Sequence, residues 1–219
     1  IKGQLKNGLT YYIQKNTKPE QKVELRLVVK AGSVLEDEDQ QGLAHFTEHM
    51  AFNGSRHFKK NELVSFLESI GVKFGADLNA YTGFDETVYI LPIPTDKPEN
   101  FEKGMMVLAD WATGLRFDAD EIEKERGVVL EEARLGKGAG ERIRNQILPK
   151  ILHGSKYADR LPIGKEETIQ HFKPEALKRF YADWYRPNLM AVVIVGDQAP
   201  TAGSTDNEAA GPHTGGLEM

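Results

Sequence analysis

Two histidines and a glutamate stand close together in the segment His45-Phe46-Thr47-Glu48-His49. The order H-x-x-E-H inverts the H-E-x-x-H pattern of many zinc enzymes. We expect a helix over about residues 42–53, and on a helix positions i, i+3 and i+4 share one face. The two imidazoles can then hold a divalent metal, and the Glu48 carboxylate can take a proton from metal-bound water.

The expected helix is otherwise apolar, so its three polar side chains need partners. One alternative is a pair of core histidines that bond to Glu48 without any metal. A catalytic zinc instead requires a third protein ligand and leaves one position for water. The chain has no cysteine, and its other histidines stand singly and are expected on the surface: His57, His153, His171 and His213. The third ligand is therefore expected to be a carboxylate.

A second expected helix carries two suitable carboxylates. Asp118 and Glu121 have the spacing of a capping box, which predicts a helix that begins after Asp118. Glu125 and Glu132 are nearly two whole turns apart, so they share a face with two valines. Glu131 lies about 100 degrees away and is interpreted as surface charge. Helix geometry leaves either Glu132 or Glu125 as the third ligand, and the alternative is two carboxylates at the edge of an ordinary helix.

These residues together resemble a known family. His45-x-x-Glu48-His49, followed well downstream by Glu125 and Glu132, is similar to the pitrilysin-type zinc peptidases, the inverzincins of peptidase family M16. The resemblance covers about residues 1–197 and is strongest to bacterial members. Further segments that follow the family order are 7–12, 31–33, 50–54, 79–82, 181–188 and 195–197.

The resemblance implies a role for each residue of the motif. His45, His49 and Glu132 match the metal ligands, with Zn²⁺ as the implied cofactor. Glu48 matches the catalytic base that activates zinc-bound water. Glu125 matches a catalytic carboxylate that orients a ligand from outside the metal's own shell. The implied function is that of a zinc-dependent endopeptidase acting on peptides or unfolded segments.

The resemblance also implies a substrate strand and a larger protein. Asn79, Ala80 and Tyr81 match the strand edge on which the family adds a substrate peptide, although the sequence alone fits an ordinary strand equally well. A second homologous M16 half or C-terminal domain closes the chamber in the family, so we expect this domain to be weakly active alone. The alternative is a non-catalytic zinc-binding domain that serves in assembly. Likeness to bacterial members implies the periplasm or cell envelope.

The composition is that of a globular domain. Hydrophobic residues make up 40% of the 219, and the formal net charge is −5, which argues against a nucleic-acid partner. No apolar run reaches the length of a transmembrane span. The chain begins at Ile1, so we expect a mature form or a fragment. The ribosylhomocysteine lyases share the inverted motif but use a cysteine ligand, which this chain lacks.

Hydrophobic periodicity predicts an α+β fold with a largely antiparallel sheet packed with helices, the type that the M16 (LuxS/MPP-like metallohydrolase) resemblance implies. Strands are expected over 3–5, 9–13, 23–29, 73–81, 85–92 and 189–196. Helices are expected over 42–53, from 61, from 98, from 119, over 140–151 and over 174–184. Residues 1–197 form the expected domain, and 198–219, which contain no Lys or Arg, are expected to be a disordered tail, a linker or foreign sequence.

Overall fold

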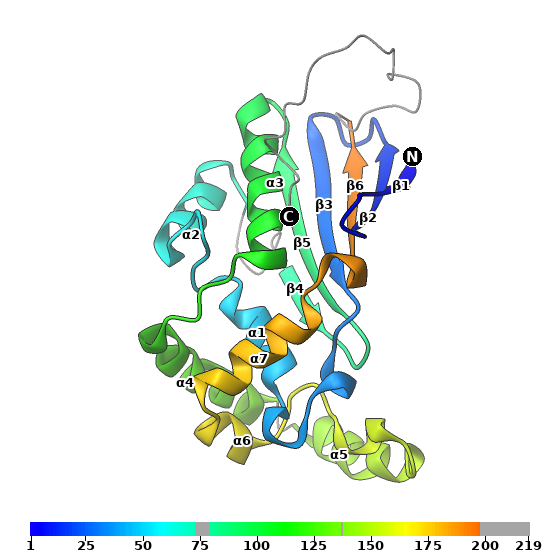
Figure 1. Ribbon diagram of the computed structural model, residues 1–219, viewed down its shortest axis with the longest axis vertical. Helices are drawn as coiled ribbons and strands as arrows, with labels where there is room; N and C mark the ends of the chain where they lie inside the picture. The colour runs from blue at the N-terminus through cyan, green and yellow to red at the C-terminus, as the bar shows by residue number, and fades with distance from the viewer. Residues whose placement is uncertain (73–78, 137, 198–219) are drawn as a thin grey trace.

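A six-stranded sheet forms the upper part of the computed structural model, which describes residues 1–72, 79–136 and 138–197 (Figure 1). The strands are β1 Lys2–Gln4, β2 Thr10–Lys15, β3 Lys22–Val29, β4 Asn79–Thr82, β5 Thr87–Pro94 and β6 Met190–Gly196. Their order is β1-β2-β6-β3-β5-β4, and each neighbouring pair is antiparallel except β2 with β6. The structure confirms the predicted α+β fold with a largely antiparallel sheet.

Strand β3 lies between β5 and β6 and carries the alternation expected from the sequence. Val23, Leu25, Leu27 and Val29 are buried on one face, whereas residues 24, 26 and 28 are only partly buried on the other. The buried face packs against helix α3, Pro98–Thr113. A Cβ at Gly104 would lie 2.9 Å from the Ile93 side chain, so glycine lets α3 approach the sheet this closely.

The remaining helices gather below and beside the sheet (Figure 1). They are α1 Leu43–Met50, α2 Lys60–Ser69, α4 Ala119–Leu135, α5 Ala139–Ile151, α6 Glu166–His171 and α7 Pro174–Trp184. Short 3-10 turns occur at Ser33–Leu35, Glu38–Gln40, Lys156–Asp159 and Pro187–Leu189.

Helix α1 lies between two hydrophobic cores. Ala44 and Ala51 belong to the core under the sheet. Leu43, Phe46 and Met50 belong to a second core that α4, α6 and α7 complete. Burying one large apolar side chain such as Phe46 stabilises the fold by about 1.5–3 kcal/mol, so this double packing fixes the orientation of α1.

Two expectations for local structure differ from the fold. The capping box is wrong: α4 begins after Asp118, but the Asp118 side chain makes no cap hydrogen bond and pairs with Arg116. Glu121 instead contacts Lys60 and Lys124, because two cations stabilise its charge more than one backbone N–H does. Helix α6 was not predicted, since six residues are too few to show a helical period.

Other expectations fall partly outside the described residues. The strand expected over 73–81 is described only as Asn79–Thr82, and the predicted tail 198–219 is not described. The domain boundary at 197 therefore stays a prediction. Across the described ranges, no helix is both long enough and apolar enough to span a membrane.

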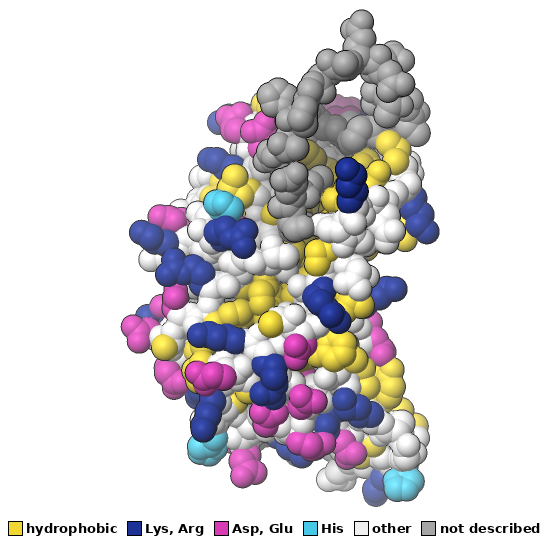
Figure 2. Space-filling model, in the orientation of Figure 1, with side chains coloured by type: hydrophobic (Ala, Val, Ile, Leu, Met, Phe, Trp, Pro, Cys, Tyr) yellow, Lys and Arg dark blue, Asp and Glu magenta, His cyan; other side chains and the backbone are white. Residues whose placement is uncertain are grey.

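The surface of the helical half mixes charges of both signs. Figure 2 shows Lys and Arg side chains interspersed with Asp and Glu over the lower part of this face, where α4, α6 and α7 lie. Helix α5 projects from the bottom of the molecule, and none of its described side chains is buried.

Candidate metal centre

Helix α1 carries His45, Glu48 and His49, and its N-terminus is capped by a side chain that is not adjacent in the sequence. Gly42 precedes the helix with φ of 104°, a left-handed conformation that favours glycine. Glu36, six residues upstream, takes the place of a local cap. Its Oε2 accepts the Gly42 N–H at 3.0 Å and its Oε1 accepts the Ala44 N–H at 2.8 Å. The role of Glu36 could not be predicted from the sequence, because its partners lie beyond the usual capping spacing.

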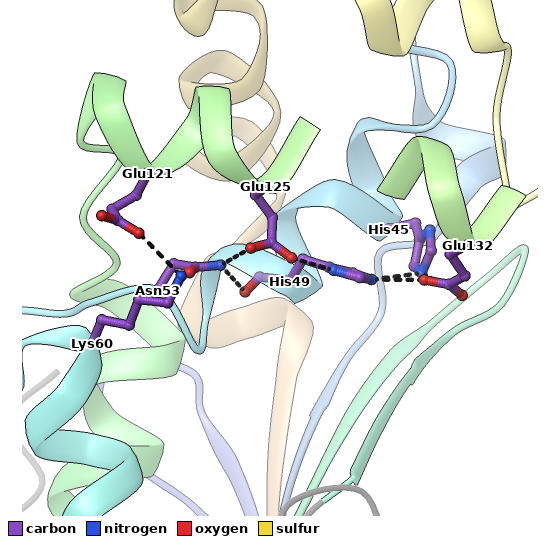
Figure 3. A network of polar contacts seen from close by, with 7 residues as sticks. All are labelled: His45, His49, Asn53, Lys60, Glu121, Glu125 and Glu132. Atoms are coloured by element: carbon purple, nitrogen blue, oxygen red, sulfur yellow. Dashed lines mark hydrogen bonds and ion pairs between the residues drawn. The ribbon is translucent and has the colours of Figure 1, made fainter. Parts of the chain in front are cut away.

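Helix α4 brings a carboxylate to these histidines. Ile122 and Val129 are buried on α4 and pack in the second core. Glu132 lies almost one turn beyond Val129, so it points towards α1 from the end of that face. Figure 3 shows His45, His49 and Glu132 directed towards one another.

The ligand atoms of the three residues converge on one point. His49 Nε2 lies 3.2 Å from His45 Nε2 and 3.2 Å from Glu132 Oε2. His45 Nε2 lies 3.7 Å from Glu132 Oε1. A tetrahedral zinc site with bonds of about 2.0–2.2 Å has ligand atoms about 3.3–3.6 Å apart. Three such donors therefore fit one tetrahedral cation and leave a fourth position open.

The other ring nitrogens of the histidines differ in their surroundings. His49 Nδ1 lies 2.7 Å from Glu125 Oε1, and Asn53 Nδ2 donates to Glu125 Oε2 at 2.7 Å (Figure 3). Glu125 is buried, so this chain of contacts fixes the plane of the His49 ring. His45 Nδ1 is buried and has no hydrogen-bond partner among the described residues. Asn53 was not singled out as a site residue from the sequence.

The pKa shifts of His45, His49 and Glu132 show which of the two histidines has surroundings that stabilise positive charge. Burial, assisted by the charge of His49, lowers the pKa of His45. Burial also lowers the pKa of His49, but its hydrogen bonds to Glu125 and Glu132 outweigh burial and the net shift is upward. The hydrogen bond to His49 lowers the pKa of Glu132. Two carboxylates thus stabilise positive charge at His49, which a divalent metal can supply in place of a proton.

Glu48 lies beside the cluster formed by His45, His49 and Glu132 but is not one of its three donors. Its carboxylate is buried and accepts a hydrogen bond from Thr82 Oγ1 at 2.6 Å. Burial raises the pKa of Glu48, and the Thr82 hydroxyl opposes this rise. A cavity of about 420 Å³ is lined by Glu48, the three clustered residues, Asn79–Thr82 and Pro162–Ile163.

Strand β4 borders this cavity and pairs, within the described sheet, only with β5. Ala80 N–H donates to Asn79 Oδ1 at 2.9 Å. This N–H is therefore not part of the β5 ladder, and in antiparallel pairing it must point to the open edge. The Tyr81 side chain is exposed at the same place. The residues singled out as a substrate strand thus lie next to the histidine and glutamate cluster.

The described histidines outside the motif are exposed, as the sequence predicts: His57, His153 and His171. His57 also bonds through Nδ1 to the buried Asp110 at 2.8 Å, while half of its side chain is exposed. Ser55 Oγ donates to the same carboxylate at 2.6 Å, so Asp110 ties this loop to α3. His213 lies outside the described residues.

Comparison with known proteins shows the family to which this chain belongs. The model of the insulinase family (peptidase family M16) matches residues 11–158. The chain belongs to peptidase family M16. A zinc protease PQQL-like of Arabidopsis thaliana is 46% identical over 195 residues, which cover 89% of this chain and 20% of that protein. A probable zinc protease PqqL of Haemophilus influenzae is 42% identical over 195 residues, covering 89% of this chain and 21% of that protein.

A solved M16 structure has the same fold. The first half of the periplasmic protease PqqL from Escherichia coli superposes with a TM-score of 0.86 at 40% identity, covering 90% of this chain and 42% of that one. The chain thus spans about a fifth of the length of the curated M16 relatives described above. Membership of M16 confirms the family resemblance seen in the sequence.

Proposed function

We propose that residues 1–197 form the zinc-binding catalytic domain of an M16 metalloendopeptidase, with His45, His49 and Glu132 as the metal ligands. The observation that carries the proposal is the convergence of these donor atoms beside Glu48, on a cavity that the open edge of β4 also borders. The relatives from Arabidopsis thaliana and Haemophilus influenzae are named as zinc proteases, which supports zinc as the metal.

In the proposed reaction this chain supplies a base, an oriented ligand and a docking edge. Zinc, when bound, would act as a Lewis acid towards water and towards the peptide carbonyl. Glu48 takes up the proton of the attacking water and passes it to the leaving amine. Glu125 holds the His49 ring through Nδ1, so His49 keeps its Nε2 directed at the metal position.

The substrate in this proposal is a peptide or an unfolded segment that pairs with β4 as an added strand. Ala80 offers its N–H at the open edge, and the Asn79 side chain that now accepts it must move aside. Backbone pairing is independent of side-chain identity, so such a site recognises extended chains in general. Asn79 and Tyr81 flank Ala80 in the strand, so their side chains lie on one face of β4 and the Ala80 side chain lies on the other.

The proposal extends to the whole protein. A second homologous half or a C-terminal domain would close the cavity over the substrate, which agrees with the fraction of the relatives that this chain spans. The periplasm or cell envelope is the proposed location, supported by the periplasmic relative from Escherichia coli.

Cleavage of a pool of unfolded peptides, read by mass spectrometry for wild type and Glu48→Gln, tests the proposal. Both proteins should bind one zinc, because Glu48 is not among the three clustered donors. Cuts should occur with the wild type and disappear with the variant. A zinc-loaded wild type that cuts nothing within its complete polypeptide would favour the non-catalytic assembly role.

A further inference from the structure

A hydroxyl on the substrate strand touches the proposed catalytic base. Thr82, the last residue of β4, donates from Oγ1 to Glu48 Oε2 at 2.6 Å. The pleat of the strand explains this direction: Asn79 and Tyr81 are exposed, whereas Ala80 and Thr82 are partly buried on the face that packs inward. Residue 82 therefore points at α1 because of its place in the strand alternation.

Two oxygens lie within reach of the Thr82 hydroxyl, one on Glu48 and one on Thr87 in the next strand. Thr87 is the cross-strand partner of Thr82, and their Oγ1 atoms lie 3.4 Å apart. Thr87 is fully buried and donates its own hydroxyl proton to the Ala31 carbonyl at 2.8 Å. Each hydroxyl carries one proton. Thr87 therefore does not donate to Thr82 and could only accept from it, across 3.4 Å. The Thr82 proton goes to the closer and charged acceptor, Glu48 Oε2 at 2.6 Å.

The hydrogen bond from Thr82 matters for the orientation of the Glu48 carboxylate because Glu48 is buried. The residue is 8% exposed, so little water replaces a lost partner. Among the residues that the structure describes, Thr82 is the hydrogen-bond donor to its carboxylate. A hydrogen bond from a neutral hydroxyl to a buried carboxylate is about twice as strong as one between neutral groups. Without this donor the carboxylate would be free to rotate about its last bond.

We propose that Thr82 is a positioning residue whose hydroxyl holds the Glu48 carboxylate towards the cavity shared with His45, His49 and Glu132. The strand that docks the peptide then also aligns the base, so that substrate and base are placed by one element. This inference rests on the proposed function of Glu48 as the base. It predicts an effect on the chemical step and not on metal binding, since the Thr82 hydroxyl bonds to Glu48 and to none of the three donors in the cluster.

The test compares Thr82→Val, which keeps the shape and removes the hydroxyl, with Thr82→Ser, which keeps the hydroxyl and removes a methyl group. Both are made in the complete polypeptide that carries these residues, and kcat, KM and zinc content are measured on a peptide that the wild type cleaves. Thr82→Val should lower kcat about ten- to hundredfold with KM unchanged within about threefold. Thr82→Ser should keep kcat within about threefold of wild type.

A parallel measurement separates alignment of the base from loss of the fold. In a Glu48→Gln background, adding Thr82→Val should leave the affinity for an uncleaved peptide and the zinc content unchanged. Equal kcat for wild type and Thr82→Val would overturn the inference, as would equal losses for the Val and Ser variants. Full activity of Glu48→Gln would instead overturn the proposed function itself, whatever the Thr82 variants do.

Discussion

Glu132 Oε2 lies 3.2 Å from His49 Nε2, a contact that joins α4 to α1. Glu131 precedes it in the sequence but faces another way and pairs with Arg134 at 2.6 Å. The two side chains are exposed to nearly the same extent, 51% for Glu132 and 52% for Glu131. Two adjacent glutamates of equal chemistry and equal exposure therefore differ mainly in what they face.

Glu132→Gln should lower the affinity for zinc by more than about a hundredfold. An outer partner of a ligand already costs about 10- to 100-fold when it is removed, and loss of a direct charged donor should cost more. Glu131→Gln is the matched control, and it should bind zinc like the wild type. Competition with a chelating dye measures both affinities. Similar affinities for the two variants would exclude Glu132 as a ligand.

Ala80→Pro should weaken peptide binding while preserving the fold. Ala80 directs its N–H to the open edge of β4, so proline removes that donor without breaking a hydrogen bond to β5. The loss of one backbone hydrogen bond should weaken peptide affinity about three- to tenfold. The affinity is best measured in a Glu48→Gln background, where the peptide is not cut. Unchanged affinity with a folded variant would show that peptides do not pair with β4.

Glu36 should make stability depend on pH. Burial raises its pKa from the ordinary 4.5 to about 8, although the N–H groups of Ala44 and Gly42 and the charge of Arg160 lower it. Between these two values the folded chain binds more protons at this site than the unfolded chain. This contribution to the free energy of unfolding is therefore complete below pH 4.5 and is lost as pH rises through about 8.

Glu36→Gln isolates that contribution, because glutamine does not titrate. The free energy of unfolding of the wild type should decrease relative to the variant as pH rises through this window. Urea unfolding of both proteins at a series of pH values measures the difference. A difference that stays constant with pH would mean that Glu36 has an ordinary pKa in the folded state.

The local parts of the fold could be predicted from the sequence. Alternation in β3 and the helical spacing of His45, Glu48 and His49 depend only on backbone periods of two and 3.6 residues. The capping box at Asp118 failed because side chains distant in the sequence, such as Lys60, offered Glu121 a stronger partner. Contacts of this kind have no local signature.

Backbone periodicity alone predicts that two histidines and a glutamate share one helix face, and that Glu125 and Glu132 share another. The packing of α4 against α1 places Glu132 beside both histidines and Glu125 on the other side of the His49 ring, and this arrangement has no counterpart in the local sequence. Packing in the second core sets the position and rotation of α4 relative to α1. The sheet sets where Thr82 and Ala80 of β4 lie relative to α1. Backbone periodicity is a property of neighbouring residues, whereas the register between elements arises from packing across the whole chain.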